Sequence, residues 1–144
     1  MTQTVVDRVF RQDEATATLP LVGRIVADIR RDSSALEGVL PRLKEARIRS
    51  RADATHGREL DRLRVEVADI TTRFERYLGE LAQVGCLYRG STGHVDFRSE
   101  EDGQPVFLCW SPEEPTVAWS HPLGLDCRHR SPVAGHLAMP LVGS

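Results

Sequence analysis

Lysine and cysteine are both scarce in this chain, and net charge is nearly absent. A single lysine, Lys44, stands against eighteen arginines, and the acidic residues leave a net charge of −2. That balance excludes the strong positive field that attracts nucleic acids or anionic membranes. No apolar run approaches the roughly 20 residues of a membrane span, and the N-terminal residues lack the apolar core of a signal peptide. We therefore expect neither nucleic acid nor a membrane as a partner.

The cysteines number only three, Cys86, Cys109 and Cys127. Their number is odd, and no pair has the C-x-x-C spacing of many metal and redox motifs. We interpret them as reduced thiols, which are typical of a cytoplasmic protein. Cytoplasmic localisation is the prediction that follows.

Residues 13–84 are predicted to form a long antiparallel helical hairpin. Asp13 and Glu14 suit the first turn of a helix, where acidic groups meet unpaired N–H groups. Pro20 then either kinks this helix or restarts it at a first-turn position. The stretch 47–57 has no clean periodicity, and we expect it to be the turn between the two helices.

The second helix, residues 57–84, has the clearest pattern in the chain. Its apolar residues recur three and four apart, as in the seam of a coiled coil, and Gly85 is a natural end for it. In the first helix, Asp32 interrupts the apolar stripe at an inward position. It could pair with an arginine such as Arg64 or Arg73, or it could stand in solvent on a rotated helix. The seam consists of Leu60, Leu63, Val67, Ile70, Phe74, Tyr77, Leu81 and Val84.

From residue 86 to residue 121 the pattern changes to short alternating strands, which predict a small antiparallel β-meander. The dipeptide Asp102-Gly103 is a hairpin turn signal, and prolines bound a second turn at residues 111–115. Residues 122–144 have little pattern and are expected to cover the sheet. The strands are predicted at residues 94–97, 105–110 and 116–121.

The fold class is therefore α+β, in a single domain spanning residues 1–144. A helix over residues 57–84 is about 40 Å long at 1.5 Å per residue, whereas a six-residue strand spans only about 20 Å. A small meander cannot cover two such helices. We therefore expect a homodimer that forms through the helices.

The turns also predict which side chains share a face. If Asp102-Gly103 is a two-residue loop, Asp96 falls opposite Cys109. If residues 111–115 form the next loop, Cys109 falls opposite Val117, and His121 lies about 13 Å along the sheet from the Cys109 row. The apolar face is predicted to hold Val95, Phe97, Val106, Leu108, Trp110 and Ala118, and the opposite face His94, Asp96, Phe107, Cys109, Val117, Trp119 and His121.

Imidazole, carboxylate and thiolate groups on one face are metal ligands, and Zn²⁺ or Fe²⁺ accepts such a mixed set. We predict a divalent transition metal as cofactor. Against this, no pair has the diagnostic spacing of H-E-x-x-H or C-x-x-C, and Cys109 could instead be a small buried apolar group. The candidate ligands are His94, Asp96, Cys109 and His121, with Asp126, Cys127, His129 and His136 available from the closing segment.

Other chemistry remains open on the same face. Cys109 near a histidine is the minimum for thiolate catalysis, and Trp119 with Phe107 could line a small-molecule pocket. Glu113 and Glu114, in the proline-flanked turn, could act as acid or base or be solvated.

The chain also resembles a known family, the uncharacterised bacterial family called domain of unknown function 2203. The shared pattern is FxxxEAxxxLP near the start, a long helical pair, GxVDF, a glycine turn, VxLCW, a glutamate, VA, a histidine and RxP. The matching residues are Phe10, Glu14, Ala15, Leu19, Pro20, Gly93, Val95, Asp96, Phe97, Gly103, Val106, Leu108, Cys109, Trp110, Glu114, Val117, Ala118, His121, Arg130 and Pro132.

The resemblance implies architecture and candidate positions, but no activity. Those positions are Asp96, Cys109, Glu114, His121 and Arg130, among which Glu114 and Arg130 are the candidate catalytic residues. The chain departs from the family pattern by having His94 at an aliphatic position, Ser120 at a tryptophan position, and Leu125-Asp126-Cys127-Arg128-His129 at a glycine-containing segment.

The sequence thus favours a cytoplasmic metal-binding protein, with an enzyme acting on a small molecule as one form of it. A non-catalytic helical scaffold is the first alternative. A metal-free small-molecule binder or cyclase-type enzyme is the second.

Overall fold

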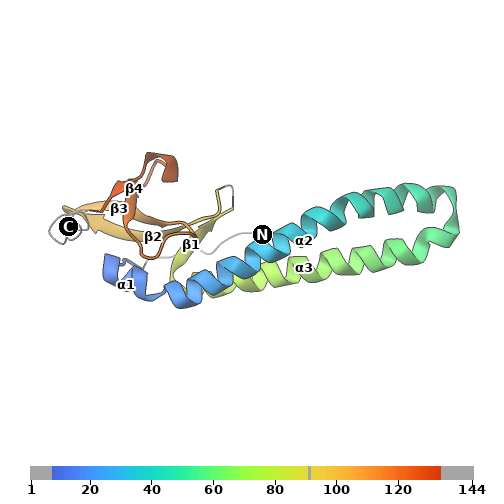
Figure 1. Cartoon of the computed structure of the whole chain (residues 1–144), viewed down its shortest axis with the longest axis horizontal. Coiled ribbons are helices and arrows are strands. Elements are labelled where there is room, and N and C mark those ends of the chain that lie inside the picture. Colours follow the sequence, from blue (N-terminus) through green and yellow to red (C-terminus); the bar gives the residue numbers. More distant parts are fainter. Residues whose placement is uncertain (1–7, 91, 134–144) are drawn as a thin grey trace. The chain divides into compact units, whose positions relative to one another are not determined.

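The computed structural model describes residues 8–90 and 92–133, and the chain forms two compact units. One is a hairpin unit, Val26–Tyr77, made of two helices. The other is a sheet unit, which combines the described residues up to Ile25 with those from Leu78 onward. Figure 1 shows the helices and strands of each unit.

Three α-helices precede the sheet. They are α1 (Gln12–Ala17), α2 (Leu19–Ala52) and α3 (Gly57–Val84), and a single 3₁₀ turn, η1 (Ala54–His56), separates the last two. The helical hairpin is confirmed. The predicted turn over residues 47–57 is wrong in part, because α2 runs on to Ala52.

Local chemistry sets the helix ends. The Glu14 carboxylate accepts a hydrogen bond from the Arg11 backbone N–H at 2.8 Å, which satisfies a donor at the start of α1. Pro20 is the second residue of α2, where its missing N–H is not needed. Gly85 follows α3 with a φ of +103°, a conformation that favours glycine and ends the helix.

The hairpin unit has its own apolar core. Val39, Leu43 and Ala46 of α2 pack against Leu60 and Leu63 of α3. The three- and four-residue spacing of these positions places them on one face of each helix. The predicted coiled-coil seam is therefore the contact between the two helices of one chain.

Asp32 is the polar member of this interface, and only 4% of its surface is exposed. Arg73 donates to it from Nε at 2.9 Å, and the Tyr77 hydroxyl donates at 2.8 Å. The hydrogen bond from Arg73 lowers the pKa of Asp32 below its usual range, and that from Tyr77 adds to it. Of the two alternatives for Asp32, pairing with Arg73 is therefore the observed one.

The sheet has five antiparallel strands in chain order. The strands are β1 (Cys86–Arg89), β2 (His94–Glu101), β3 (Gln104–Trp110), β4 (Trp119–Pro122) and β5 (Ser131–Pro132), with a 3₁₀ turn, η2 (Cys127–His129), between the last two. The turn between β2 and β3 consists of Asp102 and Gly103, both with positive φ, as a two-residue hairpin turn requires.

The register of the first predicted hairpin is confirmed, since Asp96 pairs with Cys109. The second register is wrong. Cys109 pairs with Trp119 and not with Val117, and His121 pairs with Phe107. The connection between β3 and β4 covers residues 111–118 and is longer than the predicted five-residue loop, which brings His121 two positions closer to Cys109.

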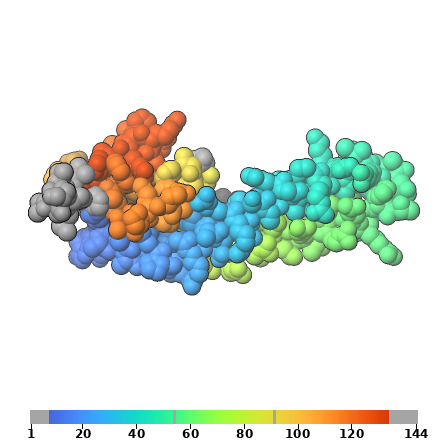
Figure 2. Space-filling model, viewed as in Figure 1, coloured from blue at the N-terminus to red at the C-terminus, as the bar shows by residue number. Residues whose placement is uncertain are grey.

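Both faces of the sheet are covered. On the apolar face, Phe10 meets Phe97 edge to face, with ring centroids 5.1 Å apart. The opposite face, called the polar face below, carries Asp96, Cys109 and His121. The segment after β4 covers this face, and Cys109 is fully buried. Figure 2 shows this segment, coloured orange to red, at the outer surface of the sheet unit.

Candidate metal centre

Four buried side chains meet on the polar face of the sheet. They are Asp96 from β2, Cys109 from β3, His121 from β4 and Cys127 from η2. Each offers one metal-ligating atom, and all four atoms lie within 4.8 Å of one another. Exposed fractions of 2%, 0%, 2% and 7%, in the same order, show that the cluster is enclosed by protein.

Strand register explains why these residues converge. Asp96 and Cys109 are direct cross-strand partners, so their side chains leave the same face side by side. His121 is two residues beyond Trp119, the partner of Cys109 on β4, and therefore has the same facing. Cys127 does not come from a strand; it belongs to η2, which follows β4 in the chain.

Cys109 and Cys127, 18 residues apart, are joined by a disulfide in this structure. The interpretation of all three cysteines as reduced thiols is therefore wrong for this pair. The physical reason is that the segment after β4 folds back over the Cys109 position, which periodicity could not predict. Cys86 remains a free, buried thiol, and burial raises its pKa to about 12.

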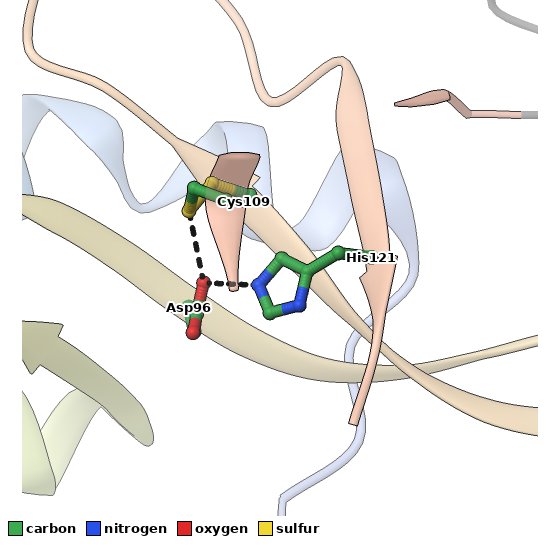
Figure 3. Close-up of side chains that lie close together, drawn as sticks. Asp96, Cys109 and His121 are labelled. Carbon is green, nitrogen blue, oxygen red and sulfur yellow. Dashed lines mark hydrogen bonds and ion pairs between the residues drawn. A yellow bond between two sulfur atoms is a disulfide. The ribbon is translucent and has the colours of Figure 1, made fainter. Parts of the chain in front are cut away.

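His121 is held at both ring nitrogens. Nδ1 lies 3.0 Å from the Pro122 carbonyl oxygen, which can only accept, so Nδ1 carries a hydrogen. Nε2 lies 3.0 Å from Oδ1 of Asp96, and one proton must lie between these two atoms for them to be hydrogen-bonded (Figure 3). The ring is thus oriented with Nε2 toward the cluster.

The two carboxylate oxygens of Asp96 have different partners. Oδ1 faces His121 (Figure 3). The same oxygen lies 3.8 Å from Sγ of Cys127. Oδ2 accepts a hydrogen bond from Nε of Arg89 at 2.8 Å. The Arg89 guanidinium also lies over the Phe107 ring, 5.2 Å from its centroid, which fixes its position. Arg89 therefore supplies the positive charge that a buried carboxylate requires.

A cavity of about 500 Å³ adjoins the cluster. Two members of the cluster, Asp96 and Cys127, contribute to its wall, whereas Cys109 and His121 do not. The remaining lining residues are Arg89, Thr92, Leu123, Gly124, Leu125, Asp126, Arg128 and His129.

Two predicted ligands lie outside this group of atoms. His94 is two residues before Asp96 on β2, and among the described residues its buried Nδ1 has no hydrogen-bond partner. His129 lines the cavity, where its Nδ1 is 3.4 Å from Oδ1 of Asp126. Hydrogen bonds from Arg128 hold the pKa of Asp126 well below its usual range. His136 lies outside the described residues.

The predicted catalytic pair, Glu114 and Arg130, meets in a different arrangement. The two side chains form a two-pronged ion pair with both N···O distances at 3.1 Å. The Glu114 carboxylate also accepts from the Ser111 backbone N–H at 2.7 Å, and Arg130 lies over the Trp119 ring. These contacts close the connection between β3 and β4, and neither residue belongs to the cluster.

Arg89 is the residue of this site that sequence reasoning missed. It lies at the end of β1, where it pairs with His94 and faces the same side of the sheet as Asp96. The sequence signal for it was the short strand β1, which ends in Arg89. Antiparallel pairing of β1 with β2 places this arginine beside the carboxylate of Asp96. A charged partner for a buried aspartate is the general expectation.

Fold and site together define an α+β protein in which a helical hairpin accompanies a five-stranded antiparallel sheet with a buried Asp–His–Cys–Cys cluster. The chain belongs to the family described as "Uncharacterized conserved protein (DUF2203)", whose model matches residues 8–133. The searches of curated proteins and of solved structures found no match. None of the described helices combines the length and the apolar composition that a membrane span requires.

Proposed function

We propose that this protein binds one divalent transition metal ion, of the zinc type, through Asp96, Cys109, His121 and Cys127 when the disulfide is reduced. The observation that carries the proposal is the convergence of four buried ligand atoms within 4.8 Å of one another. A tetrahedral zinc ion with bonds of about 2.0–2.3 Å holds its ligand atoms about 3.3–3.8 Å apart. Small side-chain rotations therefore suffice to close the site.

The donor set suits this class of metal. Two thiolates, one imidazole and one carboxylate are ligands of Zn²⁺ and Fe²⁺, whereas Mg²⁺ and Ca²⁺ prefer oxygen alone. Four protein ligands complete a tetrahedron and leave no open position for a substrate. The arrangement therefore supports metal binding more strongly than metal-dependent catalysis.

The surroundings of the ligands support the same proposal. The hydrogen bond from Nδ1 of His121 to the Pro122 carbonyl leaves Nε2 as the coordinating atom, as in many histidine ligands. A metal would take the place of the proton between His121 and Asp96. Two thiolates and one carboxylate carry three negative charges, which a divalent ion and the Arg89 guanidinium together neutralise.

Metal and disulfide exclude each other at this site. A thiolate is the ligand form of cysteine, and a disulfide sulfur carries no charge to donate. The proposed metal-bound state is therefore the dithiol state, which is favoured in a reducing compartment such as the cytoplasm. Oxidation of the two cysteines would release the ion.

The test is elemental analysis of the full chain after equilibration with Zn²⁺ and removal of loosely bound metal. We expect one zinc per chain for the reduced protein and none for the disulfide form. The variant Cys86→Ala is the matched control, since it removes a thiol outside the cluster and should retain the metal. Reduced protein that retains no zinc would refute the proposal.

A further inference from the structure

The two cysteines of the Cys109–Cys127 disulfide differ in their surroundings. Cys109 is completely buried beneath the sheet's covering segment, whereas Cys127 is 7% exposed. Cys127 also forms part of the wall of the 500 Å³ cavity, and Cys109 does not. A small molecule inside this cavity would therefore contact Cys127 and not Cys109.

We propose that this disulfide exchanges with a small thiol bound in the cavity, with Cys127 as the attacked sulfur and Cys109 as the leaving group. The inference concerns the oxidised protein, so it does not depend on metal binding. What carries it is the placement of one cysteine of the disulfide in a cavity wall, while the other cysteine is fully buried.

The exchange proceeds in two balanced steps. First, the thiolate of the incoming thiol bonds to Sγ of Cys127, the Cys109–Cys127 bond breaks, and its electron pair leaves on Sγ of Cys109. Second, another thiolate attacks the small-molecule sulfur of this mixed disulfide and frees Cys127 as a thiolate. Two thiols are oxidised to one small disulfide, and the protein gains two electrons and two protons.

The side chains around the departing thiolate are polar. A ring nitrogen of His121 and a carboxylate oxygen of Asp96 lie within 4.8 Å of Sγ of Cys109. The Arg89 guanidinium, which donates a hydrogen bond to Asp96 at 2.8 Å, adds a positive charge beside the cluster. A nearby positive charge favours formation of a thiolate.

The cavity wall indicates the class of thiol. Its volume of about 500 Å³ lies in the range of small-molecule sites. Charged residues of both signs line it, namely Arg89, Asp126 and Arg128, together with His129. Such a wall fits a low-molecular-weight thiol that carries both ammonium and carboxylate groups, which glutathione represents as a probe.

The first experiment compares two single-cysteine sites in a Cys86→Ala background, with a chelator present. In Cys109→Ser only Cys127 is free, and in Cys127→Ser only Cys109 is free. Each variant is treated with glutathione disulfide, and mixed-disulfide formation is followed by mass spectrometry. We expect Cys127 to react roughly ten-fold faster or more, because accessibility controls thiol exchange. Equal rates, or a faster Cys109, would overturn the inference.

A second measurement needs no variant and therefore does not depend on folding of the serine mutants. The oxidised wild-type chain is treated briefly with reduced glutathione in chelator, quenched with acid and mapped by peptide mass spectrometry. Glutathione should be found on Cys127. Glutathione on Cys109, or a disulfide that resists glutathione until the chain unfolds, would contradict the inference. Failure here leaves the zinc result on reduced protein untouched, so the two proposals fail separately.

Discussion

Nε2 of His121 lies 3.0 Å from Oδ1 of Asp96, although the two residues are 25 positions apart and come from strands that are not neighbours in the sheet. The strand that lies between theirs, β3, carries Cys109, the cross-strand partner of Asp96. This contact brings His121 into the same buried cluster as Asp96 and the two cysteines. The predictions for metal binding follow from it.

Replacing His121 with alanine should weaken zinc binding by the reduced protein about 100-fold or more, since it removes a direct ligand. The matched control is His94→Ala, which deletes a histidine of the same sheet that lies outside the cluster. Competition with a chromophoric chelator measures both affinities. Equal losses in the two variants would show that the cluster does not define the site.

Reduction of the disulfide in the presence of a chelator should lower the free energy of unfolding. Closing a loop of 18 residues stabilises a chain by about 3 kcal/mol in the loop-entropy model. Added Zn²⁺ should restore part of that loss in the reduced wild type but not in Asp96→Asn, which lacks the anionic ligand. Urea unfolding followed by circular dichroism gives the values. Equal stabilisation of both proteins by zinc would contradict the assignment of Asp96.

Cys86 should be inert in the folded protein. Burial raises its thiol pKa to about 12, so the reactive thiolate is a fraction of about 10⁻⁴ at pH 8. Iodoacetamide should therefore leave the oxidised native protein unmodified at pH 8 and add one label after unfolding in urea. Rapid labelling of the native protein would show that Cys86 is exposed.

Acid should weaken the hairpin unit through Asp32. Its pKa is lowered in the folded state, chiefly by the hydrogen bond from Arg73, relative to about 3.9 in an unfolded chain. A lowered folded-state pKa means that the contribution is fully present above about pH 4 and is lost as the pH falls through the folded-state value. Asp32→Asn should therefore be less stable than wild type at pH 7, with a flatter stability profile below pH 4.

The control for this experiment is Asp28→Asn, one turn earlier on the same helix. Asp28 pairs with Arg31 near the surface, where its side chain is 35% exposed, and such pairs contribute little to stability. Urea unfolding over pH 2.5–7 should thus leave this variant close to wild type. A profile for Asp32→Asn that parallels the wild-type profile would contradict the role given to Asp32.

Local chemistry made part of this structure predictable. The apolar spacing of α3 identified its inward face, and Leu63 and Ile70 are indeed buried. Asp102-Gly103 predicted a two-residue hairpin, and that turn alone fixed Asp96 opposite Cys109. Where one short turn determines the register of two strands, the sequence is enough to predict which residues pair.

The rest depends on contacts between distant segments. Two prolines bound the second turn, but they do not reveal that the pairing of β4 with β3 begins only at Trp119. The sequence therefore predicted too large a distance between His121 and Cys109. Cys127 lies in a segment without periodicity, and its bond to Cys109 is set by tertiary folding. Asp32 was ambiguous because its partner, Arg73, is 41 residues away along the chain.

The homodimer through the helices, expected from the length of the seam, stays a prediction. The seam was expected to need a second chain to cover it, but its residues Leu60 and Leu63 pack against α2 of the same chain. Light scattering of the purified chain would decide its oligomeric state.

X-ray absorption at the zinc edge of the reduced, zinc-loaded protein tests the central claim most directly. The account predicts two sulfur neighbours at about 2.3 Å and two nitrogen or oxygen neighbours at about 2.0–2.1 Å, which correspond to the two cysteines, His121 and Asp96. A shell made only of nitrogen and oxygen, without sulfur, would contradict it.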